Sequence, residues 1–241
     1  MTNYDIFSKF YDQVMGDRIA EAEFIHKIIL DYHSEAKSIL EIACGTGAVL
    51  EFFLNKKYKV TGLDFSKKML EIAEKRISKA AIVEDDMRNF QLVNKFDVIL
   101  CLFDSINHLL EFKDWQKVFN NAKNHLNPGG LFIFDINTEA KIEYLSNDSQ
   151  IVKKFNDNYL IMDISAGKKG IAIWDIKIFE KQKKDIFKLF HEVIEERSFP
   201  LDRITRSLKK IYSKVIFFDS YREQPSNQTK RVYFVCQNLE N

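Results

Sequence analysis

Acidic residues and glycines stand together where a short apolar segment ends, near the start of the chain. Glu41 lies within the apolar segment 38–43, and Gly45 and Gly47 follow it before a stretch typical of a helix. Glycine permits the tight bend and the close backbone approach that a ligand needs. Asp64 ends the next apolar segment, and a carboxylate there can accept both hydrogens of a ribose diol. The sequence therefore predicts a nucleoside-binding bend between two strands.

The spacing of these glycines argues against a dinucleotide. The NAD fingerprint is G-x-G-x-x-G, and its third glycine is missing after Gly45-Thr46-Gly47. Glu41 stands just ahead of the bend, where its charge repels a pyrophosphate and attracts a sulfonium or an ammonium group. An adenosine joined to a cation fits these residues better than an adenosine joined to phosphates.

The elements that must position this bend alternate between strand and helix through the first 140 residues. Apolar segments predict strands at 38–43, 59–64, 80–83, 96–102 and 131–136, and periodic segments predict helices at 18–32, 48–55, 67–77 and 114–125. Repeated βα units of this kind build a parallel, doubly wound sheet. Alternation at 213–219 and 231–237 predicts a closing antiparallel pair. We expect an α/β fold, a Rossmann-like seven-stranded sheet with an antiparallel last strand.

A different pattern interrupts this fold after its fifth strand. Residues 159–166, 170–180 and 186–197 are long and rich in β-forming residues, and two turns separate them. They predict a three-stranded antiparallel β insertion.

Several segments resemble successive motifs of the class I methyltransferases that use S-adenosylmethionine (SAM). These segments are ILEIACGTGAVL (39–50), TGLDFS (61–66), EDDMRNF (84–90) and FDVILCLFDSINHL (96–109). YDIFSKFYD (4–12) and FDINTE (134–139) resemble the branch of small bacterial methyltransferases and nucleotide-sugar N-methyltransferases. The resemblance implies that the protein binds SAM as its cofactor and transfers the methyl group.

The resemblance also implies which residues line the SAM site. They are Tyr11, Glu41, Cys44, Gly45, Gly47, Asp64, Phe65, Asp86, Met87, Leu102 and Phe103. Those around the bend would hold the methionine part, and Asp64 the ribose. Asp86 would accept from the adenine amino group, although Asp85 fits the same motif one position earlier. Tyr11 and Tyr4 would belong to an N-terminal lid. Arg18 would either pair with the SAM carboxylate or lie on the surface.

Methyl transfer needs alignment of the reacting atoms and, for some acceptors, a base. His108 and Tyr11 are the candidate catalytic residues, and the alternative for His108 is a structural hydrogen bond. Asp104, Asp135 and Asn137 raise the question of a metal, but their spacing differs from that of metal-dependent methyltransferases. We expect no metal site and a role for Asp135 or Asn137 in shaping the acceptor pocket. His125, at the expected end of a helix, would only complement the helix dipole.

The composition limits the partners. Lys and Arg exceed Asp and Glu by a formal charge of +1, unlike the basic footprint of a nucleic-acid-binding protein. The start is not a signal peptide, and no apolar run approaches the ~18 residues of a membrane span. We expect a cytoplasmic protein with a small-molecule acceptor, without membrane or nucleic-acid partners, as a monomer or homodimer.

These expectations define three parts of the chain and leave other functions open. Residues 1–140 form a SAM-binding core with the lid, residues 141–198 an insertion that roofs the acceptor or forms a dimer interface, and residues 199–241 the return to the core. The leading hypothesis is methyl transfer to nitrogen or oxygen of a small molecule. The alternatives are methyl transfer to RNA or protein, and a non-catalytic SAM-binding regulator. The missing third glycine disfavours an oxidoreductase.

Overall fold

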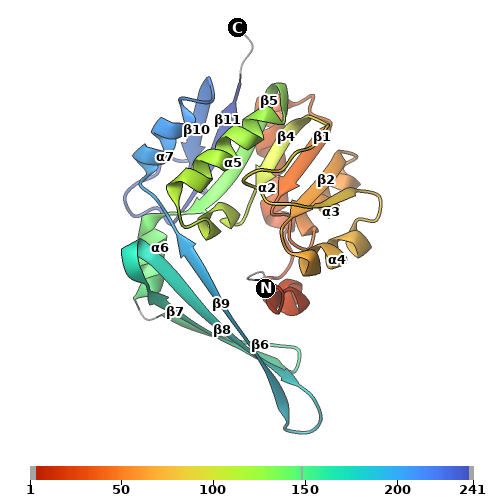
Figure 1. Ribbon diagram of the computed structural model, residues 1–241, viewed down its shortest axis with the longest axis vertical. Coiled ribbons are helices and arrows are strands. Elements are labelled where there is room, and N and C mark those ends of the chain that lie inside the picture. The colour runs from red at the N-terminus through yellow and green to blue at the C-terminus, as the bar shows by residue number, and fades with distance from the viewer. Residues whose placement is uncertain (1–3, 148, 239–241) are drawn as a thin grey trace.

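The computed structural model describes residues 4–147 and 149–238 (Figure 1). Within these residues, seven strands form one sheet in the order β10-β11-β5-β4-β1-β2-β3. Their bounds are β1 (Ser38–Ile42), β2 (Lys59–Asp64), β3 (Ala81–Glu84), β4 (Phe96–Cys101), β5 (Leu126–Asn137), β10 (Lys214–Phe218) and β11 (Arg231–Gln237). Strands β1 to β5 are parallel, whereas β11 runs antiparallel to both of its neighbours. The predicted fold class, with its antiparallel last strand, is confirmed.

Helices cover both faces of this sheet, and two apolar cores result. The helices are α2 (Ile19–His33), α3 (Ala48–Asn55), α4 (Lys67–Arg76), α5 (Phe112–Asn124) and α7 (Leu201–Leu208). Side chains of α5 and α7 pack on one face, and side chains of α2, α3 and α4 pack on the other. Strand β4 divides its residues between the two cores, Ile99 facing one and Val98 the other. Burial on both faces explains why these strands are apolar without alternation.

The insertion differs from the prediction by one strand. After helix α6 (Glu139–Ser146), the described residues form a four-stranded antiparallel sheet in the order β6-β7-β8-β9, which projects away from the core (Figure 1). Its strands are β6 (Ser149–Phe155), β7 (Asn158–Ala166), β8 (Ile171–Lys181) and β9 (Phe187–Arg197). The prediction of three strands was wrong because β6 is an edge strand. Ile151 and Val152 are both exposed there, so β6 lacks the alternation that marks a half-buried strand.

The N-terminal segment fills the space between the two sheets. The lid, residues 4–15, contains the 3-10 helix η1 (Phe7–Phe10) and helix α1 (Tyr11–Met15). Phe7, Phe10 and Val14 are buried in the same apolar core as the inner face of the second sheet. The Phe10 ring meets that of Phe190 on β9 at 5.3 Å. The second sheet therefore supports the lid from behind.

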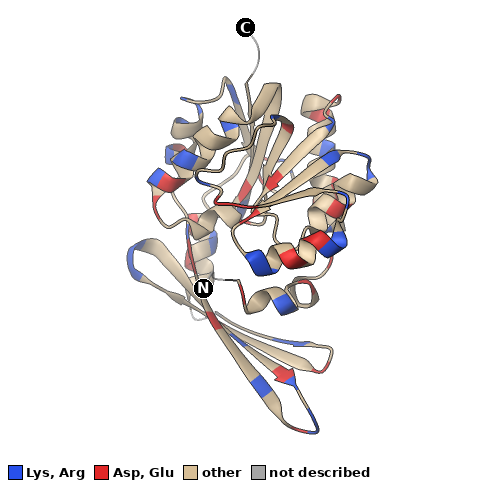
Figure 2. Cartoon of the chain, turned by 45° about the vertical axis from the view of Figure 1, so that its right-hand side comes forward, with Lys and Arg blue, Asp and Glu red and all other residues tan. Residues whose placement is uncertain are grey.

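The surface carries both signs of charge. Lys and Arg are interspersed with Asp and Glu over the helices of the core (Figure 2). Every helix among the described residues is too short or too polar to cross a membrane.

Candidate active site

The bend between β1 and α3 depends on residues in left-handed backbone conformations. Ala43, Gly45 and Gly47 have φ values of 57°, 54° and 74°. Gly47 also serves packing, because a Cβ on it would lie 3.1 Å from Ile77 and 3.3 Å from Ala73. A side chain at Gly47 would therefore be both strained and crowded.

A cavity of about 410 Å³ opens between this bend and the lid, and a smaller pocket of about 30 Å³ adjoins it. Tyr11, Ala43, Gly45, Phe103 and Ser105 line both spaces. The predicted cofactor residues lie along one or both of them, with the exception of Gly47. The large cavity has the size of a typical small-molecule site, and it lies at the carboxyl ends of the strands, where ligands of open α/β sheets bind.

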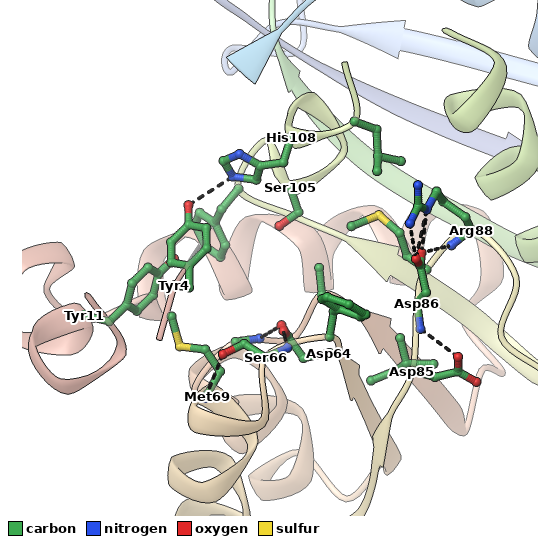
Figure 3. Close-up of a pocket in the computed structure, with 17 residues that line it drawn as sticks. Tyr4, Tyr11, Asp64, Ser66, Met69, Asp85, Asp86, Arg88, Ser105 and His108 are labelled. Carbon is green, nitrogen blue, oxygen red and sulfur yellow. Dashed lines mark hydrogen bonds and ion pairs between the residues drawn. The ribbon is translucent and has the colours of Figure 1, made fainter. Parts of the chain in front are cut away.

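The carboxylate of Asp64 is fixed by the backbone of the bend. One of its oxygens accepts a hydrogen bond from Gly45 N at 2.8 Å, and the other accepts one from Ser66 N at 2.8 Å (Figure 3). Burial raises the pKa of Asp64, although these backbone donors act to lower it. Each oxygen keeps a further lone pair for a donor in the cavity. Asp64 can therefore accept from two neighbouring hydroxyls without rearrangement.

The far end of the cavity is formed by the segment after β3. Asp85, Asp86, Met87 and Arg88 all line it. The carboxylate of Asp86 is engaged with the guanidinium of Arg88, which the sequence analysis did not single out (Figure 3). Burial acts to raise the pKa of Asp86, but the hydrogen bonds and charge of Arg88 lower it overall. Asp86 is thus held ionised as an acceptor.

The smaller pocket is lined by one acidic and one basic side chain. Among the described residues, Glu41 Oε2 and Arg18 Nη2 are both buried without a hydrogen-bond partner. The guanidinium of Arg18 stacks on the Phe103 ring at 4.1 Å, so Arg18 is not the surface arginine that was one reading of the sequence. Burial and the nearby charge of Asp64 raise the pKa of Glu41 well above its usual range. A buried orphan polar atom is costly, and two of them in one pocket indicate a ligand.

His108 and Tyr4 meet at the edge of the cavity beneath the lid. The Tyr4 hydroxyl lies 3.0 Å from His108 Nε2 (Figure 3). On the other side of the ring, His108 Nδ1 lies 3.3 Å from the carbonyl oxygen of Glu195 on β9. A carbonyl can only accept, so Nδ1 carries the hydrogen and Tyr4 donates to Nε2. Burial lowers the pKa of His108, which keeps the ring neutral at pH 7. Tyr11, the other candidate, lines both spaces and meets the Tyr4 ring at 6.0 Å.

The acidic residues at the ends of β4 and β5 surround an arginine. Arg231 on β11 makes ion pairs with Asp104 and Asp135, and Asn137 Nδ2 donates to Glu196 Oε2 at 3.1 Å. The guanidinium of Arg231 thus lies among these oxygen atoms. Arg231 and Glu196 escaped the sequence analysis because they come from distant segments and carry no motif.

Comparisons with known proteins point to methyltransferases. The family described as "Methyltransferase domain" matches residues 39–130. The chain is 28% identical to YqeM of Bacillus subtilis (strain 168), named as a presumed methyltransferase, over 97% of this chain and 96% of that protein. It is 37% identical to dTDP-4-amino-2,3,4,6-tetradeoxy-D-glucose N,N-dimethyltransferase of Saccharopolyspora spinosa, over 54% of this chain and 53% of the relative.

A solved structure extends the likeness of fold to the whole chain. An S-adenosylmethionine-dependent methyltransferase from Clostridium acetobutylicum ATCC 824 superposes with a TM-score of 0.85 at 24% identity, covering 99% of this chain and 100% of that one. The family match over residues 39–130, the relatives and the strand order with its antiparallel last strand support a class I methyltransferase.

Proposed function

We propose that the protein binds SAM in this cavity and moves its methyl group to a nitrogen or oxygen atom of a small-molecule acceptor. The observation that carries the proposal is a pair of buried polar atoms in the smaller pocket that lack hydrogen-bond partners among the described residues. Glu41 offers a carboxylate oxygen and Arg18 a guanidinium nitrogen, and both lack partners within the described chain. An α-amino acid presents an ammonium and a carboxylate, so its two charges complement these two groups.

The larger cavity supports a nucleoside joined to that amino acid. The two spaces share Tyr11, Gly45 and Phe103, so a ligand can extend from one into the other. Asp64 provides two oriented acceptors suited to a ribose diol. Asp86 and Met87 provide an acceptor and an apolar surface suited to adenine. These features together fit SAM.

When bound, SAM would supply a methyl group on a sulfonium, which an acceptor displaces in line. The chain contributes positioning, exclusion of water by the lid, and a path for a proton. Tyr4 donates to the unprotonated Nε2 of His108, so the Tyr4 hydroxyl can take a proton from an acceptor while passing its own to the ring. The low pKa of His108 keeps this nitrogen ready to accept.

An amine is the acceptor that we favour. The relative from Saccharopolyspora spinosa is named as an N,N-dimethyltransferase of an amino sugar, and it is 37% identical to this chain over 54% of its length. The carboxylates of Asp104 and Asp64 both act on His108, which lies in a negative field suited to an ammonium group. An ammonium must lose a proton before it can attack, and the Tyr4–His108 pair would accept that proton.

Calorimetry with ligands that share parts of SAM tests the cofactor assignment. We expect micromolar binding of SAM and S-adenosylhomocysteine and none of NADH. Arg18→Ala should weaken S-adenosylhomocysteine by about 2 kcal/mol, the scale of a hydrogen bond to a charged group, and leave 5′-methylthioadenosine, which lacks the amino acid, unaffected. Equal losses for both ligands would show that the smaller pocket does not hold the amino acid.

Arg203→Ala is the matched control. Its guanidinium stacks on the Phe112 ring at 4.2 Å, nearly the distance at which Arg18 stacks on Phe103, but Arg203 lines neither space. It should leave the affinity for both ligands unchanged.

A screen of amines and hydroxyl compounds with a labelled methyl donor tests the transfer itself. We expect label on a small amine, and slower transfer with unchanged SAM affinity for His108→Ala. Binding of SAM without transfer to any small molecule, RNA or protein would favour the regulatory alternative. Labelling confined to RNA or protein would favour a macromolecular acceptor.

A further inference from the structure

Strand β9 ends directly against the turn that carries His108. The 3-10 helix η2 (Ser105–His108) follows β4, and β9 lies at an end of the second sheet, with β8 on its other side. An edge strand presents unpaired carbonyl groups along its free side, and alternate carbonyls point the same way. On β9, the carbonyls of Glu195 and Arg197 meet η2: the first accepts from His108 Nδ1 and the second from Asn107 Nδ2.

Asn107 holds η2 against the ends of β5 and β9 by hydrogen bonds. Its side chain is fully buried and makes three hydrogen bonds to backbone: Nδ2 donates to the carbonyls of Asn137 (2.9 Å) and Arg197 (3.0 Å), and Oδ1 accepts from Asn137 N (3.1 Å). Asn107 thereby joins η2, the end of β5 and the end of β9. Arg197 adds a bond from its guanidinium to the carbonyl of Leu110 at 2.9 Å.

The hydrogen bond at one ring nitrogen of a histidine determines which nitrogen carries the proton. Among the described residues, the hydrogen-bond partner of His108 Nδ1 is a carbonyl oxygen, which requires a hydrogen on Nδ1 and leaves Nε2 as the acceptor for Tyr4. The bond is long for a hydrogen bond, at 3.3 Å, so a small displacement of η2 from β9 would break it. The tautomer of His108 thus depends on how firmly η2 is held.

We infer that Asn107 is a positioning residue, which fixes His108 in its Nδ1–H tautomer by holding the turn against the free edge of β9. The inference rests on the proposed function for its use in catalysis, since only the Nδ1–H tautomer offers Nε2 to a proton delivered through Tyr4. The second sheet then has two tasks at the site. It supports the lid, and it determines which ring nitrogen of His108 carries the hydrogen.

Nitrogen NMR of protein labelled in its histidine rings tests the inference without cofactor or acceptor. In the native protein, the Nδ1 of His108 should give the signal of a protonated ring nitrogen and Nε2 that of an unprotonated one at pH 7.5. Asn107→Ala should shift both signals towards the Nε2–H tautomer. An Nε2–H tautomer in the native protein, or unchanged signals in a folded Asn107 variant, would overturn the inference.

Asn121→Ala provides the control for loss of a buried asparagine. Asn121 is buried on α5, outside both η2 and β9, and donates from Nδ2 to the carbonyl of Phe90 at 3.2 Å. It should destabilise the protein while leaving the His108 signals in place. A shift as large as that of Asn107→Ala would assign the effect to general loosening and overturn the inference.

Tyr4→Phe keeps the test decisive even if Asn107→Ala does not fold. It removes only the bond at Nε2, so the Nδ1–H signals should persist, because β9 sets the tautomer from the other side of the ring. A change of tautomer in Tyr4→Phe would show that Tyr4 sets the tautomer, and would overturn the inference.

Once an acceptor is known, Asn107→Ala should lower kcat by up to about a hundredfold, the scale of small misplacements, with little change in KM for SAM. NMR signals as expected with no transfer activity would reject the proposed function and leave the positioning role standing.

Discussion

Arg76 on α4 and Asp12 on the lid form an ion pair across the glycine bend, with Arg76 Nη2 2.6 Å from Asp12 Oδ2. Thr46 in the bend completes the contact, because its hydroxyl donates to Asp12 Oδ1 at 2.7 Å and accepts from Arg76 Nη1 at 2.9 Å. The lid is therefore tied to the core by polar bonds on one side, while its other side packs on the second sheet through apolar side chains.

This arrangement predicts that Arg76 slows the release of ligands from the cavity. Arg76→Ala should raise the dissociation rate of S-adenosylhomocysteine about fivefold, which corresponds to ~1 kcal/mol, because the pair is partly exposed and screened by solvent. Stopped-flow displacement measures this rate. The association rate should change less, since opening of the lid does not require the pair.

Arg206→Ala is the control for the loss of the Arg76–Asp12 ion pair. Arg206 pairs with Asp202 at 2.8 Å on the surface of α7, away from the cavity. It should leave the dissociation rate unchanged. An Arg76→Ala protein that releases ligand at the native rate would show that the lid is held by its apolar side alone.

The raised pKa of Glu41 predicts that cofactor binding is coupled to the release of a proton. The pKa of Glu41 in the free protein is raised well above the usual range by burial and by the charge of Asp64. An ammonium group in the pocket would favour the ionised form, so binding of S-adenosylhomocysteine should release a proton, and affinity should rise as the pH rises towards that raised pKa. Calorimetry in buffers of different ionisation enthalpy counts the protons.

Glu41→Gln should abolish this proton release and weaken S-adenosylhomocysteine by about 2 kcal/mol, or roughly thirtyfold. Glu139→Gln is the matched control, because burial also raises the pKa of Glu139 but its side chain lines neither space. Proton release that persists in Glu41→Gln would place the coupled group elsewhere.

Asp64 should contribute to both binding and folding. Because its two oxygens accept from the backbone of Gly45 and Ser66, Asp64→Ala leaves two buried donors unpaired. We expect a loss of about 1–3 kcal/mol in the free energy of unfolding and a loss of about 1–3 kcal/mol in S-adenosylhomocysteine affinity. Urea titration and calorimetry measure the two losses separately.

Asp97→Ala separates the two roles. Asp97 Oδ2 accepts from the backbone of Lys37 at 2.9 Å and of Ser38 at 3.0 Å, at the opposite end of the sheet. It should destabilise the fold to a similar extent and leave affinity intact. An Asp64→Ala protein with native affinity would show that the ribose site has been misplaced.

The sequence predicted the core well because its strands are bounded by chemical signals. Strand β2 runs from Lys59 to Asp64 and β11 from Arg231 to Gln237, as the patterns indicated. Residues 126–130, which include Pro128 and Gly129, fell between the predicted helix at 114–125 and the predicted strand at 131–136, but β5 begins at Leu126 and passes through them with an irregular register. Backbone pairing with a neighbouring strand thus overrode a local breaker signal.

The site was predictable only where a single segment determines a residue's place. Glu41, Gly45 and Asp64 fall beside the cavity because strand ends and a bend fix them locally. The pairing of Tyr4 with His108, and that of Arg231 with Asp104, join segments about a hundred residues apart and leave no trace in spacing. His125 is another example: it does not merely complement a helix dipole, because its buried Nε2 accepts from Leu92 N at 3.1 Å.

The raised pKa of Glu196 predicts that the stability of the fold falls as the pH rises. Glu196 is 5% exposed, lies within hydrogen-bonding reach of Asp104, and burial raises its pKa well above its usual 4.5. A carboxyl whose pKa is higher in the folded protein binds more protons there than in the unfolded chain, so its contribution to stability is complete below pH 4.5 and is lost as the pH rises through the folded value. Asp135, with a pKa raised to about 6, adds to the same trend.

Glu196→Gln keeps the acceptor oxygen for Asn137 and removes the ionisation. Relative to the native protein, the variant should gain stability as the pH rises from 5 to 8, by about 1.4 kcal/mol for each unit by which the native pKa is raised within that range. Urea unfolding at several pH values measures the difference. Glu195→Gln, on the exposed face of β9, should give a curve parallel to that of the native protein. If the Glu196→Gln curve is also parallel, Glu196 is ionised in the folded protein throughout this range, and burial does not raise its pKa as expected.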